Sequence, residues 1–287
     1  MAAKPRYILT LRCPDRKAIV ATVTTLLAEQ NFLIVASHQF EDHDSGLFFM
    51  RVLFTPDEGE QVPLDILRRL FAPVATRFEM VAQFHDCAVK PRLLIAVSKF
   101  GHCLYDLLHR WRAGHLPVDI AGVVSNHEDM RSFTEWSGLP YFHLPIANGE
   151  KARQEAKIMA LVEEMGVDLV VLARYMQILS PELCAFLDGR CINIHHSFLP
   201  SFKGAKPYHQ AHARGVKIIG ATAHYVTTDL DEGPIIEQET RRVTHARTPA
   251  ELVALGQEVE CAVLARAVDW HIGRRVMVNG HRTIVFD

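Results

Sequence analysis

The chain has 287 residues, of which 49% are hydrophobic and 22% charged, and its formal net charge at pH 7 is -2. This length exceeds one typical domain, and the composition is that of a globular protein with a sizeable core. The near-neutral charge gives no electrostatic reason to expect binding to nucleic acid or to an anionic membrane.

The N-terminal residues and the cysteines both indicate a reducing compartment. Residues 1–6 lead directly into an apolar, strand-like run, without the long apolar region of a secretion signal. The longest apolar runs, such as residues 93–97, are too short to span a bilayer. The six cysteines form no C-x-x-C pair. We therefore expect a cytoplasmic protein without disulfides and without a cysteine-based zinc site.

Residues 1–86 predict one small domain with the element order β-α-β-β-α-β. Strand-like runs cover residues 7–11, 32–40, 47–54 and 75–84. Asp15 is expected to cap a first helix, and residues 63–71 to form a second. This order predicts a ferredoxin-like antiparallel sheet with two helices on one face.

Residues 87–287 predict a second domain in which strands and helices alternate. Strands are expected at residues 93–97, 118–124, 169–172 and 191–194, separated by helices near 103–108, 130–136 and 150–165. Continuous apolar strands in this rhythm indicate a parallel sheet covered on both faces. Further strands are expected at 218–226 and 234–243. A helix capped by Thr248 and a hairpin across residues 275–286 complete the predicted domain.

The strongest chemical signal lies where the strand at residues 191–194 ends. Alternation along an extended segment places Asn193 and His195 on the same side, at the edge where open parallel sheets bind ligands. An amide and an imidazole together can hold a developing oxyanion and move a proton. The acidic, turn-rich loop at residues 227–234 supplies a carboxylate that could pair with the imidazole.

Two other interpretations of these residues stay open at this point. A strand-end Asn often only satisfies loop backbone, and a single His is more often structural than catalytic. The histidines also invite a metal site, although no H-E-x-x-H motif is present and we favour acid–base chemistry without a metal. The histidines in question are His195, His196, His209, His212 and His224.

At these residues the chain resembles the folate-dependent formyltransferases. Asn193-Ile194-His195 followed by residues 197–200, and the loop at residues 230–234, are similar to the two signatures of that family. The resemblance implies that Asn193, His195 and Asp231 are the catalytic trio. Residues 173–181 are similar to the segment that holds the pterin ring, although the apolar residues there also fit a simple core position. The implied folate contacts are Met176, Gln177, Ile178, Leu179, Thr227, Thr228, Asp229 and Leu230.

Within the family, the chain is most similar to the deformylase branch. Residues 1–86 resemble an ACT domain, residues 204–211 and 220–226 resemble deformylase segments, and His196 stands where transferases commonly have Pro. The turn at residues 98–103 holds one glycine, Gly101, where transferases have a glycine-rich phosphate cradle. The resemblance implies an α/β protein: an ACT-like domain (1–86) followed by a Rossmann-like formyltransferase domain (87–287).

The implied reaction is hydrolysis of 10-formyltetrahydrofolate to formate and tetrahydrofolate, which supplies formate for purine and one-carbon metabolism, with no prosthetic group and no metal. The alternatives are a formyltransferase that uses an amine acceptor, and a catalytically silent amino-acid sensor. The ACT resemblance also implies an amino-acid effector, although Ala18 stands where related domains have glycine and could narrow that site. An exposed sheet edge favours a homo-oligomer, a dimer or a tetramer.

Overall fold

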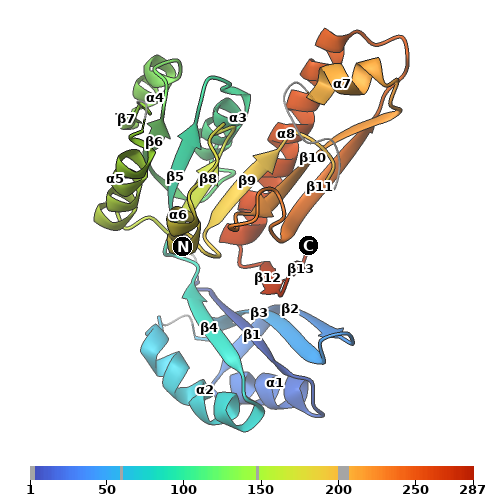
Figure 1. Ribbon diagram of the computed structural model, residues 1–287. Coiled ribbons are helices and arrows are strands. Elements are labelled where there is room, and N and C mark those ends of the chain that lie inside the picture. Colours follow the sequence, from blue (N-terminus) through green and yellow to red (C-terminus); the bar gives the residue numbers. More distant parts are fainter. Residues whose placement is uncertain (1–3, 59–60, 147–148, 200–206) are drawn as a thin grey trace. The chain divides into compact units, whose positions relative to one another are not determined.

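The computed structural model describes residues 4–58, 61–146, 149–199 and 207–287. The chain forms two compact units (Figure 1). The first holds the residues up to Lys90 together with Gly273–Met277 and Ile284–Asp287, and the second holds Pro91–Ile272 and Val278–Thr283. The end of the chain therefore divides between the two units, a division for which the sequence carries no local signal.

The first unit is a four-stranded antiparallel sheet with the strand order β2-β3-β1-β4. Alternate residues of β1, such as Tyr7, Leu9 and Leu11, are fully buried and pack against the buried stripe of α1. Helices α1 and α2 cover the same face of the sheet (Figure 1). The elements are β1 (Tyr7–Pro14), α1 (Ile19–Glu29), β2 (Phe32–Asp42), β3 (Leu47–Pro56), α2 (Leu64–Phe78) and β4 (Val81–Asp86).

Two local predictions for this unit are wrong. Asp15 does not cap α1, because the helix begins after Ala18, which adopts the left-handed conformation at φ 71° and provides no side-chain cap. The strand expected from residue 75 begins only at β4, because α2 continues through Pro73 as far as Phe78. Phe71 and Phe78 are both buried, so burial of one apolar face outweighs the helix-breaking tendency of Pro73.

The second unit is an α/β fold whose seven-stranded sheet has the order β11-β10-β9-β8-β5-β6-β7. The strands from β9 to β7 in that order are parallel, and β10 pairs antiparallel with both β9 and β11, so the predicted mostly parallel sheet is confirmed. The strands are β5 (Arg92–Val97), β6 (Asp119–Ser125), β7 (Tyr141–His143), β8 (Leu169–Leu172), β9 (Cys191–His195), β10 (Ile218–Tyr225) and β11 (Ile235–Arg242).

Helices flank this sheet, and the longest of them begins as the sequence predicts (Figure 1). Thr248 and Glu251 form a capping box: the Thr248 N–H donates to Glu251 Oε2 at 2.7 Å, and the Glu251 N–H donates to Thr248 Oγ1 at 3.3 Å. The helices are α3 (His102–Arg112), α4 (Arg131–Trp136), α5 (Lys151–Glu164), α6 (Pro181–Phe186), α7 (Pro207–Ala213) and α8 (Pro249–Ile272). The short hairpin of β12 (Val276–Asn279) and β13 (Arg282–Val285) follows, as predicted.

The pairing of β9 with β10 positions the residues of interest. The two strands run antiparallel, with Asn193 opposite His224 and His195 opposite Thr222. The fully buried Thr222 hydroxyl donates to Ser197 O at 3.0 Å and accepts from the Leu199 N–H at 3.1 Å. These bonds fasten the segment that leaves β9 onto the neighbouring strand, so the backbone on both sides of His195 is fixed.

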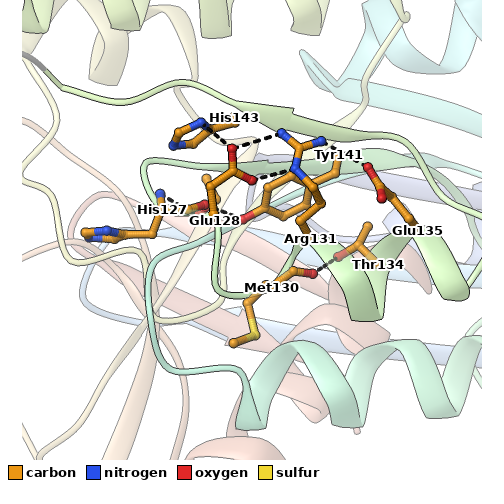
Figure 2. A network of polar contacts seen from close by, with 9 residues as sticks. His127, Glu128, Met130, Arg131, Thr134, Glu135, Tyr141 and His143 are labelled. Atoms are coloured by element: carbon orange, nitrogen blue, oxygen red, sulfur yellow. Dashed lines mark hydrogen bonds and ion pairs between the residues drawn. The ribbon is translucent and has the colours of Figure 1, made fainter.

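A separate polar network lies beyond the carboxyl ends of β6 and β7 (Figure 2). Glu128 accepts hydrogen bonds from Arg131, and the Glu128 carboxylate also lies 2.8 Å from His143 Nδ1. Arg131 donates a further hydrogen bond to Glu135 at 3.0 Å. The hydrogen bond from Arg131 lowers the pKa of Glu128. Every nitrogen of the Arg131 guanidinium therefore has a carboxylate partner in this network.

Within the described ranges, no helix is both long enough and apolar enough to cross a membrane. All six cysteines are unpaired thiols. Four of them, Cys13, Cys103, Cys184 and Cys191, are buried.

Candidate active site

A cavity of about 230 Å³ lies at the carboxyl ends of β8 and β9. Its walls come from the ends of these strands and from the loops that follow β8 and β10. The structure brings together at this cavity the three expected catalytic residues and all the expected folate contacts. These are Asn193, His195, Asp231, Met176, Gln177, Ile178, Leu179, Thr227, Thr228, Asp229 and Leu230.

The centre of the site is an imidazole–carboxylate pair. His195 Nδ1 lies 3.2 Å from Asp231 Oδ1, and the two side chains are 10% and 19% exposed. The hydrogen bond from His195, and then the proximity of His224, hold the pKa of Asp231 below its usual range, so the carboxylate is ionised at neutral pH. Because Nδ1 donates to Asp231, His195 Nε2 is left as the reactive nitrogen, and it has no hydrogen-bond partner among the residues that the structure describes.

His224 also belongs to this site, although the sequence indicated it only as a possible metal ligand and not as a neighbour of Asn193 and Asp231. It is buried, and its Nδ1 lies 2.8 Å from Tyr225 O, which can only accept, so Nδ1 carries a proton. Its Nε2 lies 3.2 Å from Asn193 Nδ2 and 3.8 Å from Asp231 Oδ1. His224 therefore fixes the side-chain amide of Asn193 next to the carboxylate. The signal for this role is the position opposite Asn193 in β10, which requires knowledge of the strand pairing.

The loop after β10 is folded so that one of its acidic residues faces the group. Asp231 adopts the left-handed conformation at φ 59° and is half-buried, whereas Asp229 and Glu232 are exposed. Gly233 packs so closely that a β-carbon there would lie 1.8 Å from Tyr225 O. Only glycine allows this approach, and the resulting turn directs the Asp231 carboxylate toward His195.

The loop after β8 forms the opposite wall of the cavity. It is attached to the end of β5, because the Met176 N–H donates to Ser98 Oγ at 3.0 Å and the Ser98 N–H donates to Arg174 O at 3.2 Å. Met176 and Ile178 are 50% and 60% exposed, so the interpretation of these two as core residues is wrong. Together with Leu230, which is 55% exposed, they offer apolar surface to a flat ring.

His196 lies against the His195 imidazole without adding charge. The two rings are stacked, with their centroids 5.0 Å apart and their planes at 20°. Burial, then the positive charge of Arg174 and the neighbouring His195, lowers the pKa of His196 to about 4. His196 is therefore neutral at pH 7 and packs beside His195 as a neutral ring.

Potential metal ligands gather elsewhere in this unit. Among the described residues, one group of three ligand side chains lies close together, formed by His102, Cys103 and Glu260. None of these three lines the cavity. His209 and His212 are exposed on α7.

The fold and the site define the class of this protein. Residues 91–268 match the family model described as formyl transferase, so the chain belongs to that family. The crystal structure of glycinamide ribonucleotide transformylase 1 from Symbiobacterium toebii is similar with a TM-score of 0.64 and 29% identity, covering 71% of this chain and 97% of the other.

More similar relatives place the chain within one branch of that class. A formyltetrahydrofolate deformylase from Corynebacterium sp. (strain P-1) is 50% identical over 285 residues, 99% of each chain. The crystal structure of the formyltetrahydrofolate deformylase from Burkholderia mallei ATCC 23344 has a TM-score of 0.94 and 53% identity, covering 99% of this chain and 100% of the other. The chain belongs to the formyltetrahydrofolate deformylase family.

Proposed function

We propose that this protein hydrolyses 10-formyltetrahydrofolate to tetrahydrofolate and formate, which then enters purine and one-carbon metabolism. The observation that carries the proposal is the pairing of His195 Nδ1 with an ionised Asp231, while His195 Nε2 has no hydrogen-bond partner within the described ranges. This arrangement suits general acid–base attack of water on a carbonyl carbon. The name shared by relatives that match the full length of the chain supports the same substrate.

In the proposed mechanism, Asn193, His195 and Asp231 are the catalytic residues. His195 Nε2 accepts a proton from the attacking water, and Asp231 stabilises the imidazolium that forms. An N–H of the Asn193 amide donates to the oxygen of the tetrahedral intermediate. Collapse of the intermediate breaks the bond between the formyl carbon and N10, and His195 returns its proton to N10. Each of these groups contributes roughly 10² to 10⁴ in rate.

We assign the folate contacts to the two walls of the cavity. Met176, Gln177, Ile178 and Leu179 line one wall, and residues 227–230 line the other. The exposed apolar side chains on both walls supply surface for a flat pterin ring, and the backbone groups of the loops supply hydrogen bonds to its edge. The substrate occupies this space without a prosthetic group in our proposal.

Incubation of the purified protein with 10-formyltetrahydrofolate, in the absence of any amine, tests the reaction class. Release of formate and tetrahydrofolate in equal amounts supports hydrolysis. Turnover that requires an added amine would instead support the formyltransferase alternative. Absence of turnover together with amino-acid binding would support the sensor alternative.

For the first unit we propose an ACT-like regulatory role with an amino-acid effector. The order of its elements and its sheet support this assignment. Ala18 adopts φ 71°, a conformation that glycine takes more easily, and its methyl group reduces the space at the start of α1. Calorimetric titration with glycine and with methionine tests the proposal, and Ala18→Gly is expected to bind the effector more tightly. Equal affinity in both proteins would contradict the role of Ala18.

We further propose that the protein is a cytoplasmic homo-oligomer. The edge strand β2 exposes a row of apolar residues, and an exposed apolar edge favours pairing with a second copy. Phe40→Lys on this strand is expected to lower the mass of the particle measured by light scattering. The exposed residues are Leu33, Ile34, Val35 and Phe40. Free thiols at all six cysteines support a reducing compartment.

A further inference from the structure

Arg174 connects the cavity to a buried polar cluster. Glu260, on α8, is 1% exposed and accepts hydrogen bonds of 2.7 Å from His102 Nε2 and from the Tyr208 hydroxyl. Arg174 Nε forms an ion pair with Glu260 Oε2 at 3.4 Å, but the two atoms do not have the geometry of a hydrogen bond. The hydrogen bond from His102 and the charge of Arg174 outweigh burial and lower the pKa of Glu260, so the pair is ionised.

Two positions in and beside this cluster, Arg174 and Gly256, are conformationally unfavourable. Arg174 adopts φ 65°, a left-handed conformation that is unfavourable for a residue other than glycine. Gly256 lies inside α8, where glycine is less favourable than alanine, and a β-carbon there would lie 2.0 Å from the Tyr208 ring. The missing side chain at Gly256 is what lets Tyr208 reach Glu260. Gly256 thus holds Tyr208 against Glu260, the carboxylate that pairs with Arg174.

The guanidinium of Arg174 lacks hydrogen-bond acceptors. Its side chain is 11% exposed, and neither Nε nor Nη1 has a hydrogen-bond partner among the residues that the structure describes. By contrast, every guanidinium nitrogen of Arg131 donates to a carboxylate (Figure 2). Glu260 therefore balances the charge of Arg174 but leaves its donors unused. Buried donors without partners are costly, so they indicate a ligand that supplies the acceptors.

Arg174 shares its cavity with the imidazole–carboxylate pair. It lines the same cavity as His195 and His196, and its positive charge helps to lower the pKa of His196. His195 Nε2 is another buried nitrogen that has no hydrogen-bond partner in the described part of the chain. A small ligand that only accepts hydrogen bonds and carries a negative charge would satisfy Arg174 next to His195.

We propose that Arg174 is the binding residue for a small carboxylate, the formate released by the reaction. This inference rests on the proposed hydrolysis, in which water forms the new C–O bond, the C–N10 bond breaks, one proton goes to N10 and the other is released from the ionised product. An amine acceptor would give a neutral formamide instead. The planar fork of arginine matches a carboxylate with two parallel hydrogen bonds. Arg174 thus gives the site a feature that only the hydrolytic product uses.

Direct binding of formate to the full-length protein tests this proposal without turnover. The probe is ¹³C-formate, followed by NMR line broadening at constant ionic strength, with sodium chloride as the competing anion. Arg174→Met is expected to weaken formate binding by about 10- to 100-fold, the loss typical of a charge-assisted hydrogen bond. Arg174→Lys keeps the positive charge but not the planar fork of the guanidinium. Its formate affinity is therefore expected to lie between those of the wild type and Arg174→Met. The matched control Arg131→Met removes a fully paired guanidinium and leaves the affinity unchanged.

Each outcome separates this inference from the reaction itself. Unchanged formate affinity in a folded Arg174→Met protein overturns the proposal; if that variant does not fold, unchanged affinity in Arg174→Lys overturns it. Displacement of formate by chloride at equal concentration would reduce the site to a general anion site and overturn its assignment to a carboxylate. If the wild-type protein releases formate from 10-formyltetrahydrofolate in any of these cases, the proposed function still stands.

Discussion

Replacing Asp231 with asparagine removes one negative charge from the reaction centre and changes little else. Asp231 adopts φ 59°, and asparagine is among the few residues that tolerate this left-handed conformation. The two side chains also have nearly the same shape. The loop after β10 should therefore keep its path, which makes Asp231→Asn a sharper test than a change to alanine.

The structure sets the size of the effect. The Asp231 carboxylate lies 3.2 Å from His195 Nδ1 and 3.8 Å from His224 Nε2, and both histidines lower its pKa. A neutral amide cannot stabilise the imidazolium that forms when His195 accepts the proton of water. We expect kcat to fall by about 10² to 10⁴, the usual contribution of a positioned acid–base group. Folate affinity should be retained, because the walls of the cavity are unchanged.

Formate release measures kcat, and a fluorescence titration with a folate ligand measures binding. The control is Glu232→Gln at the next residue, which is exposed and does not line the cavity. This variant loses the same charge from the same loop, and its kcat should equal that of the wild type. If Asp231→Asn also turns over at the wild-type rate, the assignment of the carboxylate to the chemistry is incorrect.

Three further predictions concern stability and metal dependence. The pKa of His196 is about 4 in the folded protein and about 6.5 in the unfolded chain, so the unfolded chain binds the proton first as the pH falls. Between pH 6.5 and pH 4, the free energy of unfolding therefore decreases by up to roughly 3 kcal/mol. Urea denaturation at pH 7 and pH 4.5 should show a smaller loss in His196→Gln, and an equal loss would contradict the argument. Thr248→Ala removes the cap of α8 and should cost about 1 kcal/mol in the same assay; no change in the denaturation midpoint would show that the cap contributes nothing. Dialysis against a chelator should leave kcat unchanged, because His195 and Asp231 are paired with each other, whereas a loss that zinc restores would revive a metal mechanism.

Much of the site could be predicted because it lies where local patterns change. The apolar run of β9 ends in Asn193 and His195, and alternation alone places these two on one side. The acidic residues between β10 and β11 mark a loop. These signals depend only on neighbouring residues, and the structure brings both segments to one cavity.

The features that escaped prediction depend on contacts between distant residues. His224 joins Asn193 only because β10 pairs antiparallel with β9, and nothing within either strand encodes that pairing. The burial of Arg174 depends on Glu260, which lies 86 positions later in the chain. The continuation of α2 through Pro73 likewise depends on the sheet that covers its apolar face.

The ladder between β9 and β10 has a consequence for how the protein tolerates change. Asn193 and His224 are held opposite each other by main-chain bonds, as are His195 and Thr222, so their alignment is independent of the length of the polypeptide that joins the two strands. Residues added to that connection, for example a peptide tag after Gly215, should leave the positions of these four side chains unchanged. A shift of a single residue within either strand would reverse the faces and separate all four side chains. The register of β9 and β10 should therefore tolerate few changes, whereas the length of the segment that joins them should tolerate many.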